Sequence, residues 1–255
     1  MPSYYYLDVQ ATEAVSFIGV NGVPVVADPR GRGARCVRPI NEWLLPQGNQ
    51  LTLSLSWPEA KPRQPGKALV RAAVFLADPN SEFPRPLQTL AEFKWPLPDR
   101  PETYPYQHRA AFRIPEVVPT RLWSEAPKVE ELAEKDRGAI LKLVEGLRAA
   151  LLAKDPQAAF GFLEYRYADD ARANYKAFDR IREVVIQQYG WMMKNDLTSN
   201  HLDPESAAFE LVGDGRLVRV TRQRLESAIL LESAEQFFGI EVYAAKIRGV
   251  WTLVR

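Results

Sequence analysis

The sequence predicts two halves of different architecture, an all-β sandwich over residues 1–122 and an α+β domain over residues 128–255. Eighteen of the twenty prolines lie in the first 127 residues, and proline excludes long helices because it fixes φ and removes a backbone donor. After the junction, apolar residues first recur at helical spacing and then alternate between turn signals. We therefore expect three helices, followed by four or five antiparallel strands, in the second half.

Short strands separated by turns are predicted along the first half. Asn21-Gly22 divides the run VSFIGVNGVPVV, and this dipeptide favours a type I′ hairpin turn with two positive φ angles. From Leu51 to Trp57, apolar residues alternate with Thr and Ser, which indicates a half-buried strand. Further strands are expected at 68–76, 87–95 and 108–114. Several short strands at this spacing are typical of a β-sandwich.

Four arginines fall between residues 27 and 38, in a stretch whose glycine and charge content predicts an exposed loop: Arg30, Arg32, Arg35 and Arg38. Guanidinium groups suit phosphate and carboxylate ligands. However, GRGARC lacks the lysine of a P-loop and the third glycine of a dinucleotide fingerprint. Two interpretations stay open, a loop that contacts an acidic partner surface and an ordinary solvated connection between strands.

Three helices are predicted after the junction, which we place near residues 120–128. The first follows the three-and-four apolar spacing of AILKLVEGLRAALL. Asp155-Pro156 indicates the N-cap and first turn of a second helix that continues to Phe162. A third helix is expected over 178–193, with the YGWMM cluster at its end in the core.

Strands are predicted after the polar loop at 195–204. Asp214-Gly215 lies between two alternating runs and predicts a hairpin, and Arg248-Gly249 turns the chain into the terminal VWTLVR. Two further strands are expected between these turns, at 225–231 and 238–247.

This order of elements resembles the nuclear transport factor 2-like superfamily over residues 134–255. The resemblance rests on AILKLVEGLRAALLAKDPQAAFGFL and on the final hairpin EVYAAKIRGVWTLVR. It implies an α+β cone, in which three helices pack on a curved antiparallel sheet. Cones of this superfamily often pair through the sheet, so the resemblance also implies a homodimer. Members include isomerases, dehydratases, small-molecule binders and assembly modules. The first half, through VNGVPVV and PINEWLLPQGNQLTLSL, resembles accessory β-sandwiches of modular proteins.

Candidate site residues in the second half gather where the second and third helices are expected to meet. Tyr165, Tyr167 and Asp170 form a polar and aromatic group that would line the mouth of a cone and read a ligand. In the alternative interpretation the tyrosines pack on the sheet, while Asp170 and its neighbour Asp169 cap the third helix. Glu241 is a further candidate, because alternation places it on the same strand face as Tyr243.

Composition argues against several functional classes. The net charge is +1, with 14 cationic and 12 anionic residues up to Pro127 and 19 and 20 after it, so nucleic-acid binding is disfavoured. Two histidines and one cysteine give little basis for a metal centre, and no cofactor motif is present. The segment MPSYYYLDVQ does not resemble a signal peptide, and no run approaches ~20 apolar residues, so we expect no membrane association and a cytoplasmic location.

Because no catalytic constellation is recognisable, we expect a non-catalytic binding protein, an adaptor or an inhibitor that acts through a protein partner. The alternative is a small-molecule binder or an isomerase or dehydratase that uses the cone interior, with Tyr167, Asp170 and Glu241 as its polar groups. A third hypothesis is carbohydrate binding on an exposed tryptophan of the sandwich, for which the candidates are Trp43, Trp57 and Trp95.

Overall fold

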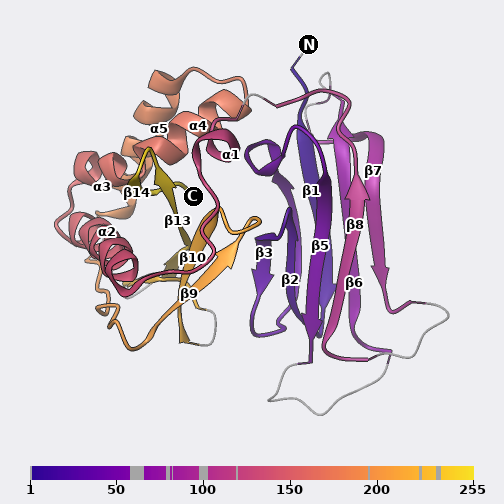
Figure 1. The fold of residues 1–255 in the computed structure, drawn as a ribbon, viewed down its shortest axis with the longest axis horizontal. Coiled ribbons are helices and arrows are strands. Elements are labelled where there is room, and N and C mark those ends of the chain that lie inside the picture. The colour runs from indigo at the N-terminus through magenta and orange to yellow at the C-terminus, as the bar shows by residue number, and fades with distance from the viewer. Residues whose placement is uncertain are drawn as a thin grey trace. The chain divides into compact units, whose positions relative to one another are not determined.

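The computed structural model describes residues 2–57, 66–78, 81, 83–97, 103–118, 120–194, 196–223, 226–233 and 237–255. The chain divides into two compact units, Met1–Pro119 and Thr120–Arg255. Figure 1 shows that its sheets are antiparallel and that the labelled helices belong to the second unit. Each unit is described by itself below.

The first unit contains two four-stranded antiparallel sheets. One has the order β4-β1-β6-β7 and the other the order β3-β2-β5-β8. The strands are β1 (Tyr5–Thr12), β2 (Val15–Val20), β3 (Val23–Asp28), β4 (Ala34–Pro39), β5 (Asn49–Ser56), β6 (Leu69–Ala77), β7 (Pro86–Trp95) and β8 (Tyr106–Phe112), with a 3-10 helix at Asn41–Trp43. Along β5 every second residue is buried, which confirms the alternation seen in the sequence, and β1 has the same burial pattern.

The Asn21-Gly22 turn between β2 and β3 is as predicted. Both residues have positive φ, 56° and 77°, which a type I′ turn requires. Asn21 also donates through Nδ2 to the Oδ1 of buried Asn49 at 2.9 Å and accepts from the Gln50 backbone at 2.9 Å. The turn is therefore tied to the start of β5 by side-chain hydrogen bonds as well as by its own backbone geometry.

The second unit begins with helices and ends with strands. The helices are α1 (Leu122–Glu125), α2 (Glu134–Leu152), α3 (Pro156–Phe162), α4 (Glu164–Ala173) and α5 (Phe178–Met192). The strands are β9 (Ala207–Val212), β10 (Leu217–Arg222), β11 (Ile229–Glu232), β12 (Phe237–Ile240), β13 (Val242–Ile247) and β14 (Val250–Leu253). Four of these strands form a sheet of order β14-β13-β10-β9, and β11 pairs with β12.

Local signals in the sequence account for several of these boundaries. The Asp155 carboxylate accepts from the Ala158 backbone at 2.9 Å and Pro156 opens α3, so the predicted N-cap is confirmed. The hairpins at Asp214-Gly215 and Arg248-Gly249 are also confirmed, with positive φ at all four residues. The single strand expected over 238–247 is wrong, because β12 and β13 are separate strands. Leu225, the expected start of another strand, lies outside the described residues.

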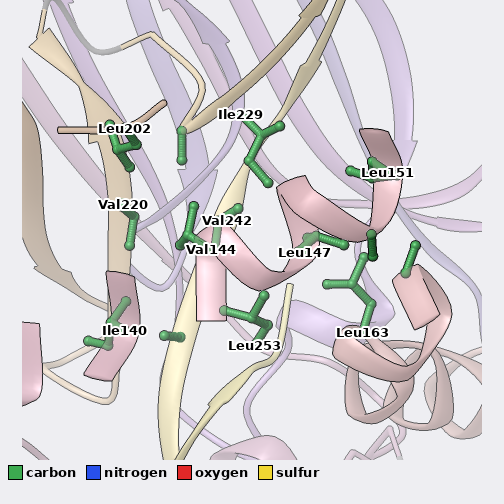
Figure 2. Close-up of a cluster of buried hydrophobic side chains, with 14 of the residues drawn as sticks. Ile140, Val144, Leu147, Leu151, Leu163, Leu202, Val220, Ile229, Val242 and Leu253 are labelled. Carbon is green, nitrogen blue, oxygen red and sulfur yellow. The ribbon is translucent and has the colours of Figure 1, made fainter. Parts of the chain in front are cut away.

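Apolar side chains of α2 pack on one face of the four-stranded sheet. Ile140, Val144, Leu147 and Leu151 are fully buried, and Figure 2 shows them among side chains from the strands and beside Leu163, which follows α3. Each fully buried side chain of this size stabilises the fold by roughly 1.5–3 kcal/mol. The space between α2 and the sheet is therefore occupied by a hydrophobic core.

The polar segment before β9 is anchored to α2 through Glu145. This carboxylate accepts from the Leu202 backbone at 3.0 Å, from Arg148 Nε at 2.7 Å and from His201 Nδ1 at 2.7 Å. Burial favours its neutral form, but these three hydrogen bonds outweigh that effect and hold the pKa of Glu145 below its ordinary value.

A buried ion pair fixes α4 to Arg255, which follows β14. Asp169 is fully buried, and its Oδ2 accepts from Arg255 Nη2 at 2.7 Å. The Arg255 side chain is 4% exposed. The second carboxylate oxygen accepts from the Arg121 backbone at 2.7 Å, so three distant segments meet at one carboxylate.

Candidate binding groove between helices α4 and α5

A hollow of about 620 Å³ lies between α4 and α5 in the second unit. Its apolar lining comes from the N-cap and the first half of α5, namely Ala177, Ile181, Val184 and Val185. Tyr167 and Asp170 of α4, Tyr175 and Lys176 of the connection, and Arg180 of α5 complete the lining. The structure thus brings two of the predicted site residues, Tyr167 and Asp170, to one groove.

The connection between the two helices places an aromatic ring at the groove. Tyr175 has φ of 54°, in the left-handed region that bulky residues seldom adopt, and it is 39% exposed. Asn174 supports this turn, because its Nδ2 donates to Asp170 Oδ1 at 2.7 Å and to the Asp170 carbonyl at 3.1 Å. One Asp170 oxygen is therefore already hydrogen-bonded within the protein.

Tyr167 is a fixed wall of the groove. Its ring stacks on Phe160 with centroids 5.4 Å apart, and its hydroxyl lies 2.8 Å from the hydroxyl of Tyr189. Burial first, and then the neighbouring Tyr167, raises the pKa of Tyr189 far above its ordinary value of 10.0. The Tyr189 phenol is consequently neutral near pH 7, and its contact with Tyr167 serves to position the two helices.

Two cations of the groove lack an ionic partner. Among the described residues, neither the Lys176 ammonium nor the Arg180 guanidinium makes an ion pair or a side-chain hydrogen bond, and both residues are exposed. The single carboxylate in the lining is Asp170, which is bonded to Asn174. The groove therefore has a net positive local charge.

Two large apolar side chains of α5 are exposed, one in the hollow and one beyond it. Val184 is 45% exposed and Trp191 is 58% exposed, and their separation of seven residues places them on the same side of the helix. Val185 and Met192, each one residue further along the helix, are buried. The expectation that the whole YGWMM cluster lies in the core is wrong at Trp191 and holds for Met192 and Met193.

The helix α4 itself was not predicted, and this changes the role of its residues. The bend expected at 165–170 is a regular helix, so Asp169 and Asp170 lie inside α4 and do not cap α5. Tyr165 is outside the groove lining; its hydroxyl donates to Glu125 at 3.1 Å and Arg121 lies over its ring at 5.4 Å. Burial is the main cause that raises the pKa of the Tyr165 phenol.

Glu241 lies apart from this groove, between β12 and β13. Its carboxylate is 3.7 Å from the buried guanidinium of Arg219, and Glu210 approaches the same guanidinium at 3.6 Å. Tyr243 pairs with Arg219 across the two strands, and burial, followed by Glu241, raises its pKa. This group occupies the sheet face opposite to the one that carries Val220 and Val242 in the hydrophobic core.

The four arginines singled out in the sequence do not all lie in one loop. The predicted loop is wrong in its second part, because Arg35 and Arg38 belong to β4, which pairs with β1. Asp28 accepts from the backbone of Arg32 at 3.1 Å and of Gly33 at 2.7 Å, so an internal carboxylate occupies those donors. Arg30 and Arg32 lie in this turn, and all four side chains are exposed.

The tryptophans considered for carbohydrate binding are largely covered. Trp43 is 8% and Trp95 is 1% exposed, whereas Trp57 is half-buried with its edge against Tyr104 at 5.8 Å. A second hollow, of about 790 Å³, lies in the first unit beside the turn at 46–50. Its buried amide, Asn49, is already hydrogen-bonded to Asn21 and to the Leu45 backbone.

Within the part of the chain that the structure describes, no three potential metal ligands gather at one place. The helices over the same residues include none that is long and apolar enough to cross a membrane.

Sequence reasoning missed Lys176, Arg180, Val184 and Tyr175. One signal was present in the sequence, the adjacent pair Val184-Val185. A helix that packs on one side needs a single apolar residue at this turn, and α5 carries two, so one of them is left exposed. Comparison of the chain with protein-family models, with curated proteins and with solved structures finds no match.

Proposed function

We propose that the protein is a non-catalytic binding protein, an adaptor or an inhibitor, and that a segment of a partner protein lies in the groove between α4 and α5. The observation that carries the proposal is the hollow itself, which is lined by the exposed Val184 and by two cations that have no ionic partner among the described residues. Trp191, 58% exposed, lies two turns further along the same side of α5. Exposed apolar surface bordered by polar groups is typical of protein interaction sites.

The alternative, a small-molecule binder or an enzyme of the isomerase or dehydratase kind, would use the space between the helices and the sheet. Apolar side chains from α2, α3 and the strands fill that space, which supports the binding protein over the enzyme. The tyrosines with raised pKa are held neutral by burial, and a neutral phenol is a weak base.

Within this proposal the protein has two domains, a β-sandwich followed by an α+β cone of the nuclear transport factor 2-like kind. The two compact units support the division, and helices followed by an antiparallel sheet support the cone. The second domain presents the groove, and a homodimer is compatible with a groove on one face of that domain.

Affinity capture with matched variants tests the proposal. Val184→Asp places a charge on the exposed apolar surface, and Val250→Asp makes the same change at a 67% exposed valine elsewhere in this unit. We expect that the wild type and Val250→Asp capture the same partner protein and that Val184→Asp does not. The binary complex is then rebuilt from the two purified proteins. Equal retention of the purified partner by both variants, or no specific partner at all, contradicts the proposal.

A further inference from the structure

We infer that the segment bound between α4 and α5 is an amphipathic helix with acidic residues at the end that meets Lys176 and Arg180. This inference rests on the proposed function and names the chemistry of the partner. It combines three observations. The groove has two cations without an ionic partner among the described residues, apolar side chains follow one side of α5, and the backbone groups of both helices are hydrogen-bonded within each helix.

The charges select an acidic partner. Lys176 and Arg180 both line the hollow, are exposed and have no anionic partner among the described residues. The acidic residues Asp179 and Glu183 belong to the same helix but do not line the hollow. A carboxylate placed in the groove would therefore be attracted by two cations, whereas a basic segment would be repelled by them.

The apolar residues select a helix of about three turns. Ile181, Val184 and Trp191 follow one side of α5 at helical spacing, and the ten steps of 1.5 Å from Ile181 to Trp191 span roughly 15 Å. A partner helix with apolar residues at i, i+3 or i+4 and i+7 matches this length and places side chains between those of α5.

The backbone of the groove argues against an extended partner. Both walls are α-helices, whose interior N–H and C=O groups are hydrogen-bonded within the helix. An added strand would need unpaired backbone groups at the site, and helix walls do not supply a row of them. A helical partner satisfies its own backbone and needs only side-chain contacts.

An anionic membrane is the competing ligand for a helix with cations and exposed apolar residues. Asp179 and Glu183 are exposed on α5, and a lipid surface that covers the helix broadly would bring its phosphates to them. A narrow partner helix in the groove avoids these carboxylates. The protein helix is therefore the ligand that the charge distribution favours.

Peptide display on the full chain tests the inference. A random library of 16-residue peptides is selected on the wild type and counter-selected on Val184→Asp. We expect enriched peptides that are helical when bound, carry apolar residues at i, i+3 or i+4 and i+7, and have acidic residues at one end. Reversal of both cations in Lys176→Glu/Arg180→Glu should weaken the selected peptides by about ten-fold or more, and selection on that variant should yield basic peptides.

A matched control keeps the net charge change equal. Lys135→Glu/Lys142→Glu reverses two exposed cations on α2, and this variant should bind the selected peptides as the wild type does. Unchanged thermal unfolding of both double variants shows that the fold is intact. Sedimentation with phosphatidylserine-containing vesicles is measured in parallel, and no binding is expected.

Several outcomes would overturn the inference: no enrichment, peptides without acidic residues, extended peptides, equal binding by both double variants, or vesicle binding that Val184→Asp abolishes. If captured partner protein binds through the groove by a basic or extended segment, this inference fails while the proposed function stands. If acidic helical peptides bind in the groove but no partner is captured, the proposed function fails instead.

Discussion

Replacement of Asp169 by Asn should strongly destabilise the second unit. The carboxylate is fully buried, and the Arg255 side chain that it contacts at 2.7 Å is only 4% exposed, so the substitution removes an opposing charge from beside a buried guanidinium. Loss of one partner of such a pair costs about 3–5 kcal/mol. We expect this decrease in the free energy of unfolding, measured by urea denaturation of the full chain with an unchanged denaturant slope.

The exposed pair Lys154–Asp196 provides the control for this prediction. Its atoms are 3.0 Å apart, but the two side chains are 47% and 102% exposed, and such pairs contribute about 1 kcal/mol or less. Asp196→Asn should therefore change the free energy of unfolding little. Adding Arg255→Met to Asp169→Asn should recover part of the loss, because it removes the buried charge. A loss in Asp169→Asn no larger than that in the control would refute the reasoning.

Three further predictions concern backbone fit and pH. Gly19→Ala should cost about 1–3 kcal/mol or more because its Cβ would overlap a backbone carbonyl of β3, whereas Gly161→Ala, with open space in α3, should gain roughly 0.5–1 kcal/mol; thermal unfolding compares the two. The raised pKa of Tyr189 contributes stability below pH 10.0 that is lost as pH rises above it. Tyr189→Phe should therefore flatten the alkaline decline in the free energy of unfolding between pH 9 and 11. An identical decline in the variant and the wild type would contradict this. The lowered pKa of Glu145 contributes stability above its ordinary value of 4.5 that is lost as pH falls, so Glu145→Gln should be less stable than wild type at pH 7 and converge with it near pH 3, as urea denaturation at both pH values would show.

Features with a local cause could be predicted from the sequence. Asn21-Gly22 and Asp155-Pro156 act through their own φ angles and short-range hydrogen bonds, and the structure has the expected turn and N-cap. The alternation from Leu51 to Leu55 identifies β5 for the same reason, since a strand with one buried face must repeat every second residue.

Features with a distant cause could not be predicted. The helix α4 buries Asp169, Ala171 and Ala173, which is a poor apolar pattern, and its aspartate is matched by Arg255, 86 residues away in sequence. The groove has the same origin. The spacing in α5 identifies a helix, but which of Val184 and Val185 is exposed depends on how α3 and α4 pack against it.

The placement of Arg35 and Arg38 on β4 has a consequence for behaviour at high concentration. This strand is the outermost of its sheet, and the two side chains are three residues apart, so one points to each face. A peripheral strand offers backbone groups that another molecule can extend into a polymer. Two identical strands of this kind would bring four positive charges together, and that repulsion protects the protein against growth of fibres from this margin.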